Sequence, residues 1–517
     1  MLVKTYGASV QGIDAIIVTV ETVSDRGLQY CIVGLPDTAV KESHERVKSA
    51  LKQSGYDVRR SSITINMSPA DVRKEGAAYD LPIALSILAA TETITTTDLD
   101  RYLIMGELSL DGSVLPIRGV LPMAIEARAR GFKGIIVPSA NATEAAVVNN
   151  LTVYGVDNLI QVIDFFTGKG TLTPTVVDTR AEFAAASDVY DFDFNEVKGQ
   201  QNVKRAFEVA CAGGHNILLV GPPGSGKSMM AKRLPSIMPP LSLAEALETT
   251  KIHSVAGTLK RGSRLMTVRP FRSPHHTISP VALVGGGSNP MPGEISLAHH
   301  GILFLDEFPE FTRSVLEVMR QPLEDRHITV SRAKYSIDYP ASFMLVASMN
   351  PCPCGYYNHP TKPCTCAPGV VNKYLNRISG PLLDRIDIQC EIMPVPFDQL
   401  ASMDGGESSE TIRERVIRAR KIQSQRFADE QGIHCNAQMN ARLLAKNCTL
   451  SEDVKKILHT AMTRYDMSAR AYERILKVAR TIADLASSPD ILPHHISEAV
   501  SYRTLDKGNW GKGYINQ

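Results

Sequence analysis

The stretch Asn216-Ile-Leu-Leu-Val-Gly-Pro-Pro-Gly-Ser-Gly-Lys-Ser228 decides the fold of the segment around it. Its four apolar residues, 217–220, predict a short buried strand. The pattern G-x-x-x-x-G-K-S then runs from Gly221 to Ser228, and a helix is predicted over residues 229–234. Between a strand and a helix this pattern is typical of a phosphate-binding loop, because its glycines let backbone N–H groups face phosphate oxygens. The stretch therefore predicts an α/β domain that binds a nucleoside triphosphate.

The loop itself supplies the predicted nucleotide-binding residues: Gly221, Pro222, Pro223, Gly224, Ser225, Gly226, Lys227, Ser228 and Met229. We expect Lys227 to reach the β- and γ-phosphates and Ser228 to give an oxygen to Mg²⁺. The predicted cofactors are therefore ATP and Mg²⁺. A Gly-rich turn that matches by chance is the alternative.

A second signature lies downstream, where the apolar run 302–305 ends in Asp306 and Glu307. Successive strand residues point to opposite sides, so the two acids can differ in role. We expect Asp306 to hold Mg²⁺ through water and Glu307 to polarise the attacking water; the alternative is a solvated turn. Asn350, after a third apolar run, is expected to orient water without carrying charge.

Arg385, in Leu382-Leu-Asp-Arg-Ile-Asp387, is expected to act as an arginine finger on the γ-phosphate of a neighbouring subunit. Arg377 is a second candidate for this role. The alternative for Arg385 is a surface salt bridge to a flanking aspartate, which contributes at most ~1 kcal/mol.

Composition narrows the class of protein. The chain of 517 residues is long enough for about three domains, and its 44% hydrophobic and 21% charged residues are typical of a globular protein. Because the net charge is only +2, any DNA contact must come from local basic clusters. We expect no signal peptide and no membrane-spanning segment, and the nine cysteines to be reduced thiols in the cytoplasm.

One basic cluster is a predicted insertion over residues 254–289. Basic residues on a Gly-flanked excursion can grip phosphates in the pore of a ring, and a solvated loop is the alternative. The predicted DNA contacts are Arg261, Arg264, Arg269 and Arg272. Residues 320–334 predict a basic hairpin with the same two interpretations.

A cysteine cluster spans residues 352–366. Cys352, Cys354, Cys364 and Cys366 suggest a tetrahedral, structural Zn²⁺ site, although the C-x-C spacing is tighter than the common C-x₂₋₄-C. A reduced loop without metal is the alternative.

The first 167 residues alternate short β-rich runs, such as 16–20, 30–33, 63–66 and 134–138, with helical runs at 39–54, 81–90 and 120–130. This predicts a mixed α/β domain. Residues 69–84 and 106–131 resemble the proteolytic domain of Lon proteases, which uses a Ser–Lys dyad. Here Ala78 stands at the Ser position and Leu121 near the Lys position, so we predict no peptidase activity. A scaffold, an assembly surface, a DNA-facing domain or a plain packing module remain open.

The order of these signals resembles the AAA+ class, in its magnesium-chelatase-like branch. The stretches 292–307, 350–355 and 378–387 resemble the ComM/YifB family more narrowly. The resemblance implies a hexameric bacterial ATPase that drives branch migration of joint DNA molecules, as in natural transformation. It also implies that Arg470 reaches the nucleotide from the lid. Arg474, one helical turn later on the same face, is the second candidate, and packing within the lid is the alternative for either arginine.

The expected fold class is therefore α/β with three parts: a Lon-like (ribosomal S5 domain 2-like) α+β domain over 1–167, an AAA+ core over 191–395 and a helical lid over 396–517. A linker is expected over 168–190. One rival function is a magnesium-insertion subunit, disfavoured by the Lon-like front domain and the cysteine cluster, because the resemblance to that subunit is expected to cover only the core and the lid. The other is a non-catalytic scaffold or an ATP-dependent protein remodeller, and the complete catalytic set argues for hydrolysis: Lys227, Asp306, Glu307, Asn350 and Arg385.

Overall fold

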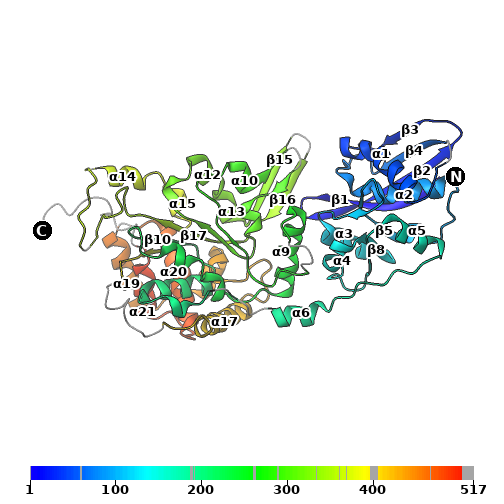
Figure 1. The fold of residues 1–517 in the computed structure, drawn as a ribbon. Coiled ribbons are helices and arrows are strands. Elements are labelled where there is room, and N and C mark those ends of the chain that lie inside the picture. The colour runs from blue at the N-terminus through cyan, green and yellow to red at the C-terminus, as the bar shows by residue number, and fades with distance from the viewer. Residues whose placement is uncertain are drawn as a thin grey trace. The chain divides into compact units, whose positions relative to one another are not determined.

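The structure is a computed structural model, and it describes residues 2–58, 61–186, 190, 192–259, 264–287, 290–332, 335–359, 361–367, 369–395, 406–465 and 467–503. The chain forms two compact units (Figure 1). The first comprises Met1–Ala186, Ser242–Thr267 and Pro290–Pro292. The second comprises Ser187–Leu241, Val268–Asn289 and Gly293–Gln517.

The first unit is built on a seven-stranded mixed sheet in the order β3-β4-β2-β1-β5-β8-β9. Its strands are β1 (Leu2–Gln11), β2 (Asp14–Asp25), β3 (Tyr30–Val33), β4 (Ser62–Ser68), β5 (Tyr102–Ile104), β8 (Gly134–Pro138) and β9 (Thr152–Val156). The pairs β1–β2 and β2–β4 are antiparallel, whereas β3–β4, β1–β5, β5–β8 and β8–β9 are parallel. Strand β1 was not predicted, although it forms a ten-residue ladder with β2.

Helices α1 (Thr38–Gln53), α2 (Asp80–Ala90), α3 (Val120–Ala129), α4 (Ser139–Ala145) and α5 (Leu159–Thr167) pack against this sheet or against one another, and α6 (Thr179–Ala186) follows them in sequence. The predicted helices over 39–54, 81–90 and 120–130 are confirmed by α1, α2 and α3. All of α2 is buried, which explains why its sequence is apolar on every side. Helix α6 lies in the segment expected to be a plain linker.

Helix α9 (Leu243–Ala256) belongs to the first unit, although it follows the phosphate loop in sequence. Ser242 and Glu245 form a capping box at its start. Near its end, Ser254 Oγ donates to Glu144 Oε1 at 2.5 Å and the Gly119 N–H donates to the Ser254 carbonyl at 3.2 Å. The expected single excursion over 254–289 is therefore divided: residues 242–267 join the first unit, and 268–289 stay with the second.

The second unit contains a five-stranded parallel sheet in the order β11-β14-β17-β10-β18. Its strands are β11 (Phe271–Arg272), β14 (Ile302–Leu305), β17 (Met344–Met349), β10 (Ile217–Val220) and β18 (Ile388–Glu391). The first of these in sequence, β10, lies between the last two, so the strand order reverses beside it. In open parallel sheets, ligands bind at the carboxyl ends of the strands at such a reversal.

Around this sheet lie α7 (Gln201–Gly213), α8 (Lys227–Ala231), α10 (Pro280–Val284), α11 (Glu294–Leu297), α12 (Arg313–Val318), α13 (Arg320–Asp325), α14 (Val370–Leu375) and α15 (Gly380–Leu383). An antiparallel hairpin of β15 (His327–Arg332) and β16 (Tyr335–Pro340) confirms the predicted hairpin, shifted toward the C-terminus. The lid contributes α17 (Ser409–Arg426), α18 (Ala441–Asn447), α19 (Glu452–Tyr465), α20 (Ala469–Leu485) and α21 (Pro493–Ser501).

A buried polar network joins the lid to the start of β10. His215 Nδ1 lies 3.2 Å from Asp387 Oδ2, and its Nε2 lies 2.8 Å from Thr481 Oγ1 on α20. Arg474, also on α20, pairs with Asp387 at 3.0 Å. Burial lowers the pKa of His215. Burial alone would raise the pKa of Asp387, but Arg474 and His215 outweigh it, and the pKa lies well below its ordinary value.

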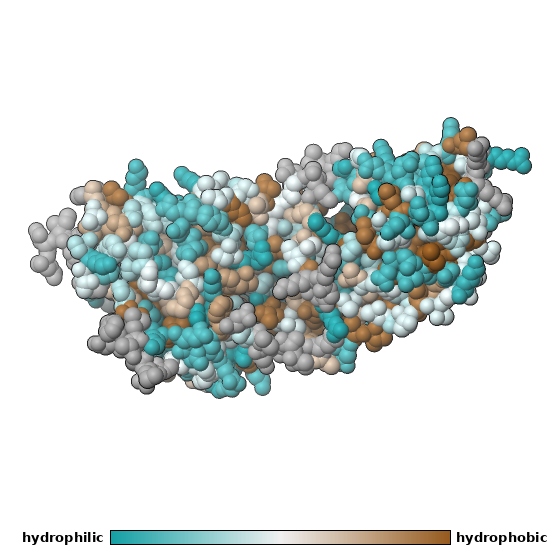
Figure 2. Space-filling model, in the orientation of Figure 1, coloured by the Kyte–Doolittle hydropathy of each residue, from teal (hydrophilic) through white to brown (hydrophobic). Residues whose placement is uncertain are grey.

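Hydrophilic residues cover much of the face shown in Figure 2, and hydrophobic residues appear there in small groups. Over the part of the chain that the structure describes, no helix combines the length and apolar character needed to cross a membrane.

Candidate nucleotide site

The phosphate loop takes the conformation that its glycines allow. Gly224 and Gly226 have φ of 80° and 87°, in the left-handed region that favours glycine. A Cβ on Gly221 would lie 2.6 Å from the Ile392 carbonyl oxygen, so the loop also needs a residue without a side chain there. Helix α8 begins at Lys227, directly after the loop.

Lys227 is 9% exposed, and its ammonium group points back into the loop. Its Nζ donates to the carbonyls of Gly221 at 2.7 Å and Pro222 at 2.9 Å, and to Asn350 Oδ1 at 3.2 Å. Burial lowers the pKa of Lys227. Asn350 follows β17, the neighbour of β10, so the sheet brings the predicted phosphate-binding lysine and the predicted water-orienting amide together.

Asp306 follows β14 and contacts the phosphate-loop segment through Ser228. Ser228 Oγ donates to Asp306 Oδ2 at 2.6 Å, and the Glu307 N–H donates to Oδ1 at 3.0 Å. Ser348 Oγ also donates to Oδ1. Ser348 was not among the predicted site residues; its place two residues before Asn350, inside an apolar strand, is the signal that could have indicated it.

Glu307 has φ of 53°, which is uncommon for a residue with a side chain and is found at functional sites. His276 Nδ1 lies 3.2 Å from Glu307 Oε2, and both groups are partly exposed. The contact restrains the carboxylate that is expected to polarise water. His276 stood in the predicted basic insertion, and no local pattern linked it to Glu307.

These residues fit ATP with Mg²⁺. The Ser225 hydroxyl oxygen is buried and has no hydrogen-bond partner among the described residues, as suits a group that meets a phosphate oxygen. Ser228 and Asp306 offer the hard oxygen ligands that Mg²⁺ prefers. When bound, the ion would neutralise charge on the phosphates. Lys227 would exchange carbonyl acceptors for phosphate oxygens, while Glu307 and Asn350 remain to position water.

The predicted catalytic arginines all have partners within the chain. Arg385, with 9% of its side chain exposed, pairs with Glu324 and the Pro381 carbonyl. Arg377, with 52% exposed, pairs with Glu310 at 2.8 Å. On the lid, Arg470 is largely exposed and lies 3.2 Å from Asp384, whereas Arg474 is held by buried Asp387. To reach a neighbouring γ-phosphate, Arg385 must first leave Glu324.

The arginines of the predicted basic insertion do not lie together in one excursion. Arg261 lies outside the described residues, and Arg264 belongs to the first unit. Arg269 donates to the carbonyls of Pro239, Pro240 and His300 at 2.6–3.1 Å, and Arg272 forms two 2.7 Å bonds with Glu294. Both guanidinium groups therefore have partners within the fold, and contact of Arg269 and Arg272 with DNA stays a prediction, which would require them to leave these partners.

The positions of the Lon dyad are part of the first unit's packing. Ala78 lies in a short 3₁₀ turn (Ala77–Tyr79) and packs against the core, and Leu121 on α3 is fully buried. Neither side chain can act as a nucleophile or a base.

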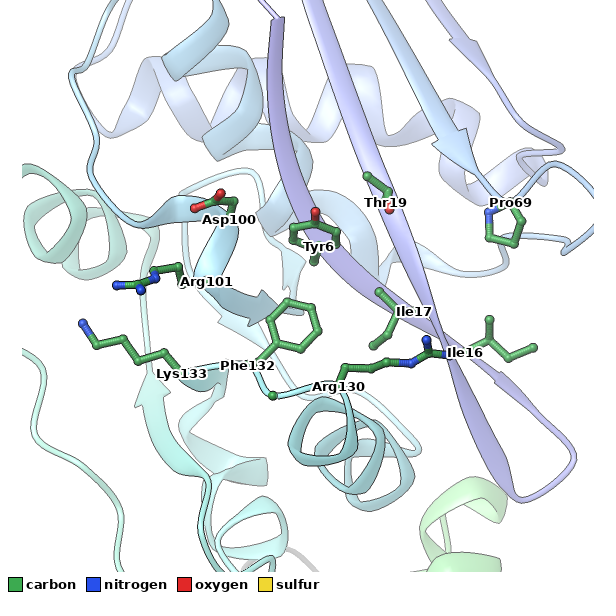
Figure 3. A pocket seen from close by; sticks show the side chains of 11 residues that line it. Tyr6, Ile16, Ile17, Thr19, Pro69, Asp100, Arg101, Arg130, Phe132 and Lys133 are labelled. Atoms are coloured by element: carbon green, nitrogen blue, oxygen red, sulfur yellow. The ribbon is translucent and has the colours of Figure 1, made fainter.

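A separate hollow of about 760 Å³ lies on the first unit (Figure 3). Tyr6, Phe132, Arg101, Arg130 and Lys133 line it. Each of its cations has an acidic partner: Arg101 and Lys133 form ion pairs with Asp98, and Arg130 forms one with Glu126. The hollow is therefore no free basic patch.

The parallel sheet, the loop between β10 and α8, and the acids after β14 define a P-loop ATPase of the AAA+ class. Sequence models of the families described as "Magnesium chelatase, subunit ChlI", "Subunit ChlI of Mg-chelatase" and "Magnesium chelatase, subunit ChlI C-terminal" match residues 193–400, 20–141 and 406–503. The chain is 44% identical over 501 residues to a protein named YifB of Salmonella typhimurium, covering 96% of each. It is 40% identical over 509 residues to competence protein ComM of Haemophilus influenzae, covering 98% of each.

The chain thus belongs to the YifB/ComM family of magnesium-chelatase-like AAA+ ATPases. Its N-terminal region is weakly similar to the archaeal Lon protease of Thermococcus kodakarensis, at 26% identity over 138 residues, or 26% of this chain and 21% of that one. One expectation was wrong: a model described as a magnesium-chelatase subunit also matches residues 20–141, so the front domain does not by itself argue against a magnesium-insertion function.

Proposed function

We propose that this chain is an ATP-driven DNA motor: a cytoplasmic, hexameric ring that promotes branch migration of joint DNA molecules and supports DNA integration in natural transformation. One observation carries the proposal. Lys227, Asp306 and Asn350 converge at the strand-order reversal of a chain that is similar over nearly its whole length to a competence protein.

The energetics suit such a motor. Branch migration breaks one base pair for each pair it forms, so the stacking of about 1.4 kcal/mol per step nearly cancels. ATP is then needed for direction, and for passage through mismatches, more than for net melting. In the ring, Arg385 of one subunit would complete the nucleotide site of the next, and Arg470 would reach the nucleotide from the lid.

The first unit would serve this motor as a scaffold and not as a peptidase, because Ala78 and Leu121 offer no Ser–Lys chemistry. Casein cleavage that is stimulated by ATP and lost in Lys227→Ala would contradict this part of the proposal.

The test is ATP turnover by the full chain with forked DNA, with three-stranded DNA and without DNA, for the wild type and Glu307→Gln. We expect both DNA structures to stimulate the wild type, and Glu307→Gln to bind ATP without turnover. The three magnesium-chelatase models favour one rival, a metal-insertion motor. Stimulation by a porphyrin together with indifference to DNA would support that rival, and stimulation by an unfolded protein alone would support a remodeller.

A further inference from the structure

Four thiols meet in the loop that follows Asn350. Cys352 Sγ lies 3.3 Å from Cys354 Sγ and 3.8 Å from Cys364 Sγ, and the Cys354–Cys364 separation is 3.5 Å. Cys366 completes the group, in which all sulfur atoms lie within 4.8 Å of one another. Cys352 is buried, the other three are partly buried, and all four are free thiols.

These separations match one metal ion and not a disulfide. In a tetrahedral site with Zn–S bonds of about 2.3 Å, the sulfur atoms lie about 3.8 Å apart. A disulfide would need about 2.05 Å, and a cluster of several iron ions would hold the sulfur atoms farther apart. The tight C-x-C spacing requires a turn that brings Cys352 and Cys354 to the same side. The structure has this turn, which the Gly355 N–H closes by donating to the Cys352 carbonyl at 3.0 Å.

Burial raises the pKa of the Cys352 and Cys364 thiols, but backbone N–H groups face two of the sulfur atoms. Backbone N–H groups of Tyr356 and Thr365 donate to Cys354, and that of Tyr357 donates to Cys352. Such donors orient and stabilise metal-bound sulfur. His359, the other metal-ligand type in this loop, uses Nδ1 to accept from the backbone N–H groups of Thr361 and Lys362. The four cysteines thus form the donor set without it.

We propose that Cys352, Cys354, Cys364 and Cys366 bind one structural Zn²⁺ ion that braces the nucleotide site. The loop touches that site twice. Cys352 follows Asn350 by two residues, and a Cβ on Gly355 would lie 2.5 Å from Pro223 Cδ in the phosphate loop. A metal that fixes the loop therefore fixes the position of Asn350 and one wall of the phosphate loop. The metal assignment is independent of the proposed DNA motor; the bracing role rests only on the nucleotide site.

The first test is the metal content of the purified full chain, for the wild type, Cys354→Ser, Cys364→Ser and the control Cys31→Ser. Cys31 is exposed on β3 of the first unit. We expect about one zinc per chain in the wild type and in the control, and near zero in the other two variants. Zinc that persists in both variants, iron in place of zinc, or no metal after expression with added zinc would overturn the assignment.

A second test needs only wild-type protein, in case the variants do not fold. Replacing zinc by Co²⁺ should give the visible absorption of a tetrahedral cobalt–thiolate site. A spectrum without thiolate bands would contradict the proposal. Affinity for a fluorescent ATP analogue then tests the bracing role: we expect metal removal to weaken binding and zinc to restore it. Unchanged affinity would overturn the brace but leave the metal site, and DNA-stimulated turnover is not involved in either readout.

Discussion

The phosphate-loop region and the region around Ala78 and Leu121 differ in what they place at the positions of catalysis. In the first, ammonium, hydroxyl, amide and carboxylate groups lie within hydrogen-bonding distance at the ends of parallel strands. In the second, a methyl group and a buried isobutyl group take the places of a nucleophile and a base. Apolar packing alone is therefore enough to keep a sheet and its helices folded, whereas ATP hydrolysis depends on each polar side chain of the site.

The largest expected effect is that of replacing Arg385, which tests whether the nucleotide site needs a residue from a neighbouring subunit. Arg385→Ala should lower ATP turnover by about 10³-fold or more and leave ATP binding nearly unchanged, because a finger acts on charge in the transition state. Turnover and nucleotide affinity of the assembled protein are the measurements. Arg377→Ala is the matched control; if it abolished turnover while Arg385→Ala did not, the exposed arginine would be the finger.

The next effect concerns Lys227 in the phosphate-loop region. Lys227→Ala should lower ATP turnover by about 10²–10³-fold, because it removes the buried ammonium group that is expected to exchange its carbonyl acceptors for phosphate oxygens. Lys232→Ala, on an exposed lysine just after α8, should behave as the wild type in the same turnover assay. Equal losses in the two variants would mean that the lysine at 227 has no special role.

The next prediction concerns the region around Ala78 and Leu121, where a lysine is placed at the position of the Lon dyad lysine. Leu121→Lys should destabilise the first unit by about 2–5 kcal/mol, because a buried leucine is lost and a charge is left without a prepared partner. Denaturant unfolding measures the change. Leu110→Lys, at a position that is 56% exposed, should have little effect. A Leu121→Lys protein as stable as the wild type would show that a dyad lysine still has room there.

A smaller effect concerns pH. Burial lowers the pKa of His215, so the folded state favours its neutral form. Its contribution is fully present above the unfolded pKa of about 6.5 and is lost as the pH falls below it, by at most about 1.4 kcal/mol per pH unit. Unfolding between pH 7.5 and 5.5 should show this loss in the wild type and in the exposed-site control His327→Asn. His215→Asn should flatten the slope, and an unchanged slope would assign it to other groups.

The smallest effect concerns Glu307. His276→Ala should raise DNA-free ATP turnover by at most about fivefold, because an exposed pair contributes no more than ~1 kcal/mol to holding the carboxylate. His275→Ala is the neighbouring control: the His275 ring pairs with Thr277 and packs against the His276 ring, with the ring centroids 4.1 Å apart, so it tests ring packing without the pair to Glu307. A fall in turnover in His276→Ala would instead give the imidazole a positive part in hydrolysis.

Local patterns predicted much of this molecule. The loop over 216–228, the acids after β14 and the amide after β17 follow from strand, turn and helix signals within a few residues. The roles of Ser348 and His276 depend on side chains that meet only after folding: the place of Ser348 in an apolar strand was a weak signal, and no local pattern linked His276 to Glu307. The same holds for Arg269 and Arg272, whose partners lie 22–31 residues away, and for α9, whose place in the first unit depends on contacts with α3 and Glu144.

We propose that ATP hydrolysis at this site moves a DNA junction. The most direct measurement follows a labelled strand in a three-stranded joint molecule with the wild type and ATP, with a non-hydrolysable ATP analogue, and with Glu307→Gln. The account predicts strand displacement only by the wild type with ATP. If the joint molecules stayed unchanged while the wild type hydrolysed ATP, or if Glu307→Gln displaced the strand as well as the wild type did, the account would be contradicted.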